Sequence, residues 1–217
     1  MKKFLFKLAR SRSMGYLVGK TVQHLPFIIP ARSLYKSKEI YACNHPVPSY
    51  KFHTLIIPRK RIPNVLQLDS RSFSQIVNVA HILSQGIDTP LLLCVNGGVR
   101  QDVKQLHFHL ISTADGSKYT AFGCQCTMFE NDEVTICGNG KFFSVSAKDV
   151  NIDADTAMQA LFHATIDFIE NVLNDSNAGG VGYSLLVHKR IGSDTFDPRI
   201  FIDFNTEITY PYNISQE

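Results

Sequence analysis

The stretch Gln105-Leu106-His107-Phe108-His109-Leu110-Ile111 decides the fold of this chain. Successive side chains of a β-strand point to opposite faces, so the apolar residues of the stretch would share one buried face. The opposite face would carry the polar residues Gln105, His107 and His109. Two neighbouring imidazoles gain little from each other and repel if both are protonated. The pattern therefore favours an anionic or metallic guest on this face, and a phosphate group above all.

A helix is predicted upstream of the histidines, because apolar residues recur there at helical spacing. They are Phe73, Ile76, Val77, Ala80 and Leu83. Asp69 or Ser72 can cap the N-terminus of this helix, and Gly86 can end it.

Short strands flank this helix on both sides. Before it they cover residues 39–43 and 52–57, with a proline-containing turn between them. After it a buried strand at residues 91–96 is followed by a loop with Gly97 and Gly98, and then by the histidine strand. The predicted order is strand, strand, helix, strand, strand.

The second half of the chain repeats this order. Its elements are strands at residues 132–137, 142–148, 184–187 and 199–204 and a helix whose stripe contains Met158, Leu161, Phe162, Thr165, Ile169 and Val172. The strand that corresponds to the histidine strand has no histidines. Because repeats fix architecture, we predict an α+β fold, with an antiparallel sheet, helices and two tandem pseudo-repeats in one chain.

These elements predict one compact domain with three parts. Residues 1–37 would form a basic N-terminal helical segment, residues 38–116 the unit that carries the motif, and residues 117–217 a degenerate second unit. One unit alone would leave an edge strand and a sheet face uncovered. We therefore expect a monomeric pseudo-dimer with one site per chain, with a homodimer as the alternative.

Charge is distributed unevenly along the 217 residues. The chain has 22 Lys and Arg and 19 Asp and Glu, yet thirteen of the basic residues and one acid, Glu39, precede Asp69. The basic half holds or flanks the candidate phosphate site, with Arg59 to Arg61 expected beside it. A solvated basic face is the alternative interpretation.

The five cysteines are odd in number and include no C-x-x-C pair, which favours a reducing cytoplasm, buried thiols and no metal site. The sequence shows no signal peptide and no apolar run of the roughly 20 residues that cross a bilayer. A short amphipathic helix at the N-terminus could contact anionic lipid, but packing against its own domain is favoured. No cofactor and no specific nucleic-acid partner are expected.

From Glu39 to Ser112 the sequence resembles the histidine-triad (HIT) superfamily, whose signature is His-φ-His-φ-His-φ-φ, where φ is apolar. The resemblance rests on the segment from Phe52 to Ile62, on Asn96-Gly97-Gly98 and on the segment from Gln101 to Ile111. With its repeat, the whole chain resembles the two-repeat members, such as galactose-1-phosphate uridylyltransferases and scavenger decapping enzymes. In those proteins a single chain contributes paired HIT units.

The resemblance implies a role for each matching residue. His107 would be the nucleophile that attacks an α-phosphate and forms a nucleotidyl-histidine. His109 would hydrogen-bond the phosphate or the leaving group. His53, Asn96 and Gln105 would join His109 as polar donors that stabilise the charge of the transferring phosphoryl group. Gln101 is a further candidate substrate-binding residue.

Two departures from the family pattern affect this expectation. Gln105 replaces the first histidine, so it could orient a ligand but could not carry a proton. We expect it on the solvent-facing side of the strand, where the change Gln105→His would cost little stability. Asn44 or His45 stands where family members carry an acid that binds ribose hydroxyls, so both are candidate substrate-binding residues.

Two functions are consistent with these residues. The favoured one is an enzyme, a nucleotide phosphohydrolase or nucleotidyltransferase that acts through a covalent nucleotidyl-histidine. The alternative is a catalytically weak or inactive module that binds a nucleotide or a phosphate. In both cases the ligand is a nucleotide or a nucleotide conjugate. A structural or membrane-peripheral interaction protein is a third and weaker interpretation.

Overall fold

The computed structural model describes residues 31–101, 103–112, 127–130, 134–138, 140–148, 153–175, 180–190 and 192–204. The elements of the first half are β1 (Ser33–Lys36), β2 (Ile40–Asn44), β3 (His53–Pro58), the short 3-10 helix η2 (Val65–Gln67), α3 (Ser70–Leu83), β4 (Leu91–Gly98) and β5 (Phe108–Ser112). Those of the second half are β6 (Thr127–Glu130), β7 (Val134–Gly138), β8 (Phe142–Ala147), α5 (Ala154–Asp175), β9 (Gly182–Lys189) and β10 (Arg199–Phe204).

All strands join one ten-stranded antiparallel sheet, in the order β1-β2-β3-β5-β4-β9-β10-β8-β7-β6. From its centre outward the first half reads β4, β5, β3, β2, β1, and the second half reads β9, β10, β8, β7, β6 in the same pattern. The α+β fold with two tandem pseudo-repeats is thus confirmed.

Each repeat begins with one more strand than the sequence predicts. β1 pairs with β2, and β6 pairs with β7. Ser33–Lys36 therefore form a sheet strand, and their assignment to a helical segment was wrong. These strands have four residues each, too few to show a period in the sequence. Residues 1–30, the rest of the predicted N-terminal segment, lie outside the described residues.

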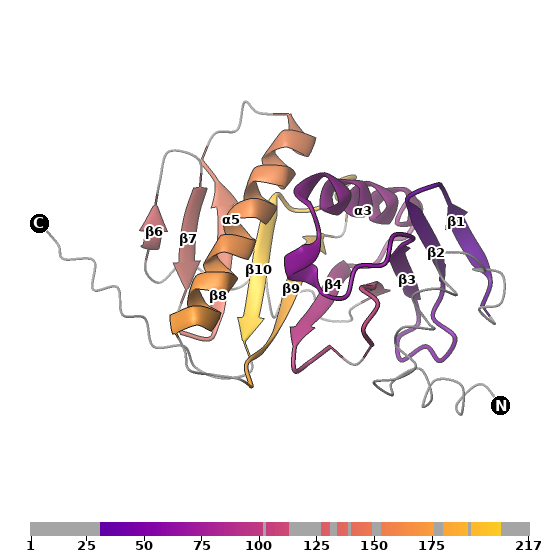
Figure 1. Ribbon diagram of the computed structural model, residues 1–217. Helices are drawn as coiled ribbons and strands as arrows, with labels where there is room; N and C mark the ends of the chain where they lie inside the picture. Colours follow the sequence, from indigo (N-terminus) through magenta and orange to yellow (C-terminus); the bar gives the residue numbers. More distant parts are fainter. Residues whose placement is uncertain are drawn as a thin grey trace, which may run out of the picture.

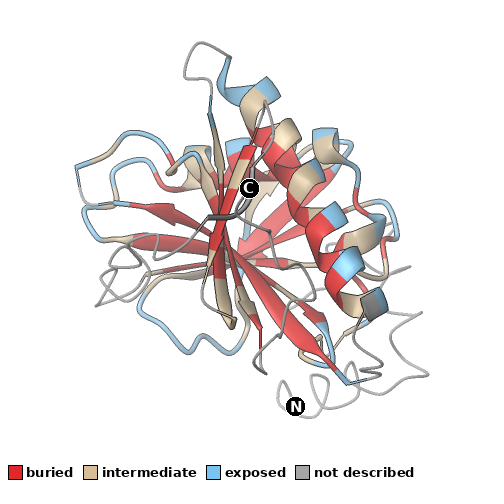
Figure 2. Ribbon diagram, turned by 90° about the vertical axis from the view of Figure 1, so that its left-hand side faces the viewer, coloured by how far each residue is buried: buried red, intermediate tan, exposed pale blue. Residues whose placement is uncertain are grey.

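The two α-helices among the described residues cover the same face of the sheet, α3 over the first repeat and α5 over the second (Figure 1). One core cluster extends under both helices, and it includes the predicted stripe residues Phe73, Ile76 and Phe162. Phe73 and Phe162 stack at a ring distance of 4.2 Å where the helices meet. In Figure 2 the exposed residues of the helices lie away from the sheet. The repeats therefore share a single core.

The start and end of α3 agree with the sequence. Asp69 is the N-cap, and its carboxylate accepts a hydrogen bond of 2.8 Å from the backbone N–H of Ser72. Gly86 follows the helix with a φ of +73°, a conformation that glycine adopts most easily. No described helix is long and apolar enough to cross a membrane.

The repeats join where β4 pairs with β9, from Leu91 opposite Lys189 to Gly98 opposite Gly182. Gly97 and Gly98, predicted in a loop, are the last residues of β4. A side chain at Gly97 would collide with the ring of Tyr183, and Gly98 has a φ of +59° against the carbonyl of Val181. These glycines therefore allow the close approach of the two repeats.

The sheet face away from the helices positions the candidate site. Small apolar clusters lie on this open face, one around Leu55 and Ile57 and one around Leu92 and Ile111. Cys43 and Cys94 are free thiols, as expected. Cys137 is disulfide-bonded, so the expectation of thiols was wrong for this residue.

Candidate functional site

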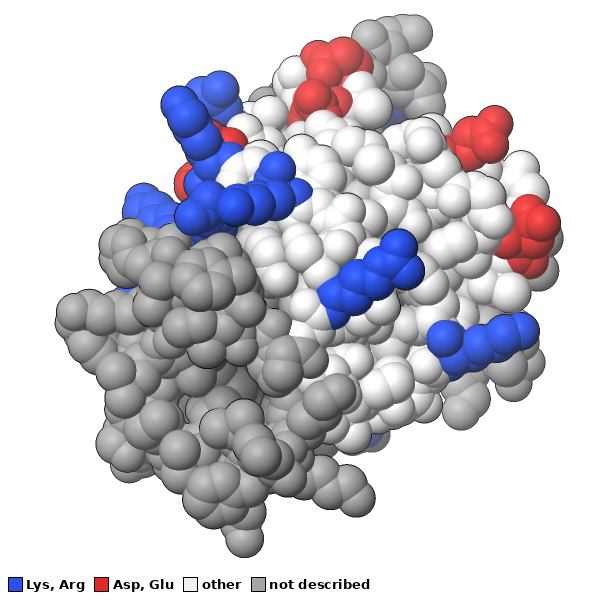
Figure 3. All heavy atoms as spheres, turned by 90° about the vertical axis from the view of Figure 1, so that its right-hand side faces the viewer, with Lys and Arg blue, Asp and Glu red and all other residues white. Residues whose placement is uncertain are grey.

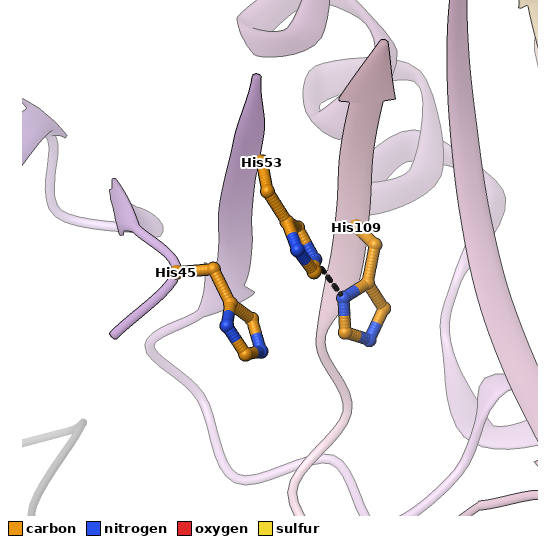
Figure 4. Close-up of side chains that lie close together, drawn as sticks. All are labelled: His45, His53 and His109. Atoms are coloured by element: carbon orange, nitrogen blue, oxygen red, sulfur yellow. Dashed lines mark hydrogen bonds between the residues drawn. The ribbon is translucent and has the colours of Figure 1, made fainter. Parts of the chain in front are cut away.

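Three histidines from neighbouring segments of the open face point toward one another (Figure 4). His109 lies on β5, between Leu55 of β3 and Cys94 of β4. His53 begins β3, and its ring lies 5.2 Å from that of His109. His45 follows β2 and stacks on His53 at 4.0 Å, with 15° between the rings. The pairing of β2 with β3 and of β3 with β5 therefore brings the three histidines together.

A chain of hydrogen bonds fixes where the protons of this cluster lie. The backbone N–H of Ser49 donates to Nδ1 of His53 at 3.3 Å, so the proton of that neutral ring is on Nε2. His53 Nε2 then donates to Nδ1 of His109 at 2.9 Å. The proton of His109 must consequently lie on its own Nε2. His109 is thereby prepared to donate a hydrogen bond to an anion.

His107 has the opposite arrangement. Its Nδ1 lies 2.9 Å from the backbone carbonyl of Gln105, which can only accept a hydrogen bond. The proton of neutral His107 is therefore on Nδ1, and the lone pair is on Nε2. The rings of His107 and His109 meet edge to face at 5.0 Å. Two adjacent rings thus provide a nitrogen lone pair, on His107, and an N–H donor, on His109.

Burial keeps these imidazoles neutral. It lowers the pKa of His109 to about 2, with further contributions from the nearby His107, His53 and His45. Burial, together with His45, lowers the pKa of His53 to about 4. Both rings are therefore uncharged near neutral pH, which removes the repulsion that a pair of protonated histidines would suffer.

Acid is expected to destabilise the fold. Since the pKa values of folded His53 and His109 lie below the ordinary value of 6.5, the unfolded chain binds more protons below that pH. Stability from the neutral rings is thus present above pH 6.5 and is lost as the pH falls toward 4. The slope is at most ~1.4 kcal/mol per pH unit for each histidine, less for His53 because solvent screens it. Buried His188, with its pKa lowered to about 4, acts in the same direction.

Urea denaturation at several pH values between 4 and 7 measures this slope. The variant His109→Gln should flatten it, whereas His163→Gln on the exposed side of α5 should leave it unchanged. Equal slopes for His109→Gln and the parent chain would contradict the assignment.

The cluster also has the spacing of a metal site. The ligand nitrogens of His45, His53 and His109 lie within 4.8 Å of one another. A histidine that binds a metal, however, usually donates its other ring N–H to an acceptor. Here backbone N–H groups donate to the Nδ1 atoms of His45, at 3.1 Å, and of His53. Their Nε2 atoms carry the protons, so the donor set fits an anion and does not fit a metal.

Gln105 occupies a different place from the predicted one. β5 begins at Phe108, and the preceding residues turn inward, with the N–H of Leu106 bonded to the carbonyl of Ile62 at 2.7 Å. The residue Gln105 is 1% exposed, and its Nε2 donates to the carbonyls of Pro58 at 3.1 Å and Lys60 at 3.3 Å. The expectation of a solvent-facing residue was wrong, because the alternation of a strand does not reach this position.

Replacement of Gln105 should therefore cost stability. We expect Gln105→Leu to lower the free energy of unfolding by about 1–3 kcal/mol, because the buried carbonyl of Pro58 loses its donor. Denaturant titration measures the loss. Gln85→Leu, a change at an exposed position, should stay within about 0.5 kcal/mol of the parent. A Gln105→Leu chain as stable as this control would contradict the burial argument.

Of the other predicted site residues, Asn96 and Asn44 belong to strands of the sheet, whereas Gln101 lies in a loop. Asn96 lies on the open face of β4, and its Oδ1 accepts a 2.7 Å hydrogen bond from the hydroxyl of Ser184. Asn44 is exposed at the end of β2, beside His45. Gln101 donates through its amide to the carbonyls of Pro63 and Val103, so these hydrogen bonds tie its side chain to two loop segments rather than to the histidines.

Sequence reasoning missed the partners that set the tautomers. The N–H groups of Val47 and Ser49 belong to the backbone and leave no signal in residue identity. Ser184 was missed because it belongs to the repeat without histidines.

Basic side chains of the first repeat lie mainly at the surface. The exposed ones are Arg32, Lys36, Lys38, Lys51, Lys60, Arg61, Arg71 and Lys104. Figure 3 shows lysines and arginines gathered at one side of the face that includes the β1 edge. Arg59 donates to the carbonyl of Ser37 at 3.1 Å, which ties it to the turn between β1 and β2. This distribution accords with a solvated basic face.

Proteins of known structure share this fold. The HIT domain family model matches residues 27–116. A GalT-like protein from Arabidopsis thaliana is similar over 89% of this chain and 83% of its own, with 9% identity and a TM-score of 0.61. For an ADP-glucose phosphorylase from the same plant, solved with bound ADP-glucose, coverage is 86% and 80%, identity 10% and TM-score 0.58. No curated protein sequence matches the chain.

A yeast Ap4A phosphorylase in complex with AMP is similar over 87% of this chain and 63% of its own, with 12% identity and a TM-score of 0.55. At these identities the likeness establishes the fold, and it extends over both repeats. The family match includes His45, His53 and His109. Residues 27–116 therefore carry a HIT domain, as the match to the family model shows.

Proposed function

We propose that this protein transfers or hydrolyses a nucleotidyl group through a covalent intermediate on His107. The observation that carries the proposal is the 2.9 Å hydrogen bond from His107 Nδ1 to the carbonyl of Gln105, which leaves the lone pair on Nε2. Nε2 of the adjacent His109 carries a proton, so a nucleophile and a donor lie side by side. Proteins of similar fold include a phosphorylase of ADP-glucose and one of Ap4A, which supports a nucleotide as ligand.

The first step forms a bond between His107 Nε2 and the α-phosphorus. The bond from phosphorus to the leaving-group oxygen breaks, and the leaving group keeps its electron pair. The Gln105 carbonyl stabilises the positive ring that results, because it accepts from Nδ1–H. His109 Nε2–H and the amide of Asn96 donate to the phosphoryl oxygens, on which negative charge develops.

The second step releases the nucleotide. Water or another acceptor attacks phosphorus, the phosphorus–nitrogen bond breaks, and its electron pair returns to His107. The returned electron pair makes the ring neutral again, with its proton still on Nδ1, and the acceptor loses its own proton to solvent. His53 takes no part in bond making; its Nε2–H keeps His109 in the tautomer that donates.

A labelling experiment tests this proposal. The full chain is incubated with adenylated and uridylylated compounds labelled at the α-phosphate, and both product release and label on the protein are scored. Label on a histidine should be lost in acid and retained in base. Protein that binds nucleotides, but neither releases product nor retains label, would contradict the covalent route.

A binding module remains the second candidate. Two observations favour it: the amide at position 105 cannot titrate, and Asn44 and His45 stand where family members have an acid. This candidate predicts saturable binding of AMP without product and without label, which the same experiment detects.

A further inference from the structure

The second repeat reaches the candidate site through one serine. Ser184 of β9 pairs with Asn96 of β4, and its hydroxyl donates to Asn96 Oδ1 at 2.7 Å. Arg100 Nη1 donates to the oxygen of the same hydroxyl at 3.0 Å and to the backbone carbonyl of Asp203 at 2.9 Å. Arg100 also forms an ion pair of 3.3 Å with Asp203 Oδ2. Four residues from both repeats thus form one network.

The donor and the acceptor of each hydrogen bond in this network can be assigned. An arginine can only donate, so Ser184 Oγ accepts from Arg100 and uses its single hydrogen toward Asn96. Of the two ends of the Asn96 amide, Oδ1 is the one that can accept this hydrogen. The amide nitrogen must then lie on the side away from Ser184.

Sheet order shows where that nitrogen points. β4 lies between β9, which carries Ser184, and β5, which carries His109. With Oδ1 held toward β9, the NH₂ group of Asn96 is left on the side of β5, the strand that carries His109. The reverse orientation would direct the partially negative Oδ1 at a phosphate oxygen, which would repel it.

We infer that the second repeat, although it lacks the histidines, orients the phosphate donor of the first. Ser184 is the positioning residue that contacts Asn96, and the ion pair of Arg100 with Asp203 holds Ser184. The hydroxyl belongs to a buried residue with 8% exposure, and the side chains of Arg100 and Asp203 are 27% and 18% exposed, so water competes weakly for these hydrogen bonds. This inference rests on the proposed function, in which Asn96 donates to the phosphoryl group.

A double-mutant cycle between Ser184 and Asn96 tests the inference. Turnover of the best substrate from the labelling panel is measured for Ser184→Ala, Asn96→Ala and the double variant. Ser184→Ala should lower kcat about tenfold with KM changed less than about threefold, as expected for a donor that is misplaced rather than lost. In the Asn96→Ala background the same change should alter kcat less than about twofold.

Two further variants separate positioning from structure. Ser184→Thr keeps a hydroxyl and should recover most of the activity. Ser146→Ala removes a serine hydroxyl from β8 of the same repeat, where it donates to the carbonyl of Thr135, and should have no effect. Equal losses from Ser184→Ala in both backgrounds would overturn the inference.

A readout that needs no turnover keeps this test independent of the proposed function. The side-chain NH₂ resonances of Asn96 in the full chain are identified by their loss in Asn96→Ala. They should shift in Ser184→Ala, and addition of AMP should shift them in the parent but much less in Ser184→Ala. Absence of turnover with these shifts present would contradict the proposed enzyme alone. Asn96 resonances that do not respond to Ser184→Ala would overturn the inference whatever the activity.

Discussion

Replacement of His107 by alanine is expected to abolish acid-labile labelling and to lower nucleotidyl turnover at least about 1,000-fold. The reason is that its Nε2 carries the lone pair that forms the bond to phosphorus, because a backbone carbonyl holds the proton on Nδ1. His109→Ala removes a donor and leaves the nucleophile. It should slow turnover by about 100-fold while labelling persists. Steady-state rates and the labelling experiment measure both effects.

His163→Ala is the matched control, because this exposed histidine lies on α5 and should leave turnover unchanged. A His107→Ala protein within about tenfold of the parent would have lost at most ~1.4 kcal/mol of transition-state stabilisation. The covalent mechanism would then be wrong.

Truncation after Ser112 is expected to give an unfolded or aggregating fragment. It removes β9, which pairs with β4 from Leu91 to Gly98, and so exposes the edge of a buried strand. It also removes Phe162, which stacks on Phe73, and the rest of the core under α5. Solubility, circular dichroism and denaturant titration of the fragment measure the result.

A chain that ends after Phe204 retains every described element and serves as the control. It should unfold in a single cooperative transition. A soluble fragment ending at Ser112 that unfolds cooperatively would show that one repeat is an independent domain. Two equivalent ligand sites in the full chain would equally contradict the pseudo-dimer with one site.

Much of the fold could be predicted because its signals are local. The stripe that includes Phe73 and Ile76 follows the helical period, and the run from Leu91 to Val95 has the length of a buried strand. The repeat of these patterns predicted the two halves of the sheet. The strands β1 and β6 are too short for such a signal, and Gly97 was assigned to a loop because its partner, the ring of Tyr183, is distant in sequence.

The sequence predicted the candidate residues of the site, but it did not predict their contacts. His107 and His109 follow from the motif, and His53 and His45 from the resemblance. Extending the alternation of β5 back to Gln105 failed, because the chain leaves the sheet before Phe108 and buries the amide against two carbonyls. The proton positions depend on backbone groups at Val47 and Ser49, which residue types do not reveal.

The pairing of β4 with β9 also bears on how the chain folds. Most other strand pairs join neighbours in their own repeat, whereas this one brings Leu91 to Lys189. Closing so long a loop costs entropy before any contact compensates it, so contacts within each repeat form sooner. The rate of folding should thus be limited by the meeting of two partly ordered halves. Asn96 acquires its final neighbours in that last step, so a competent site is a late product of folding.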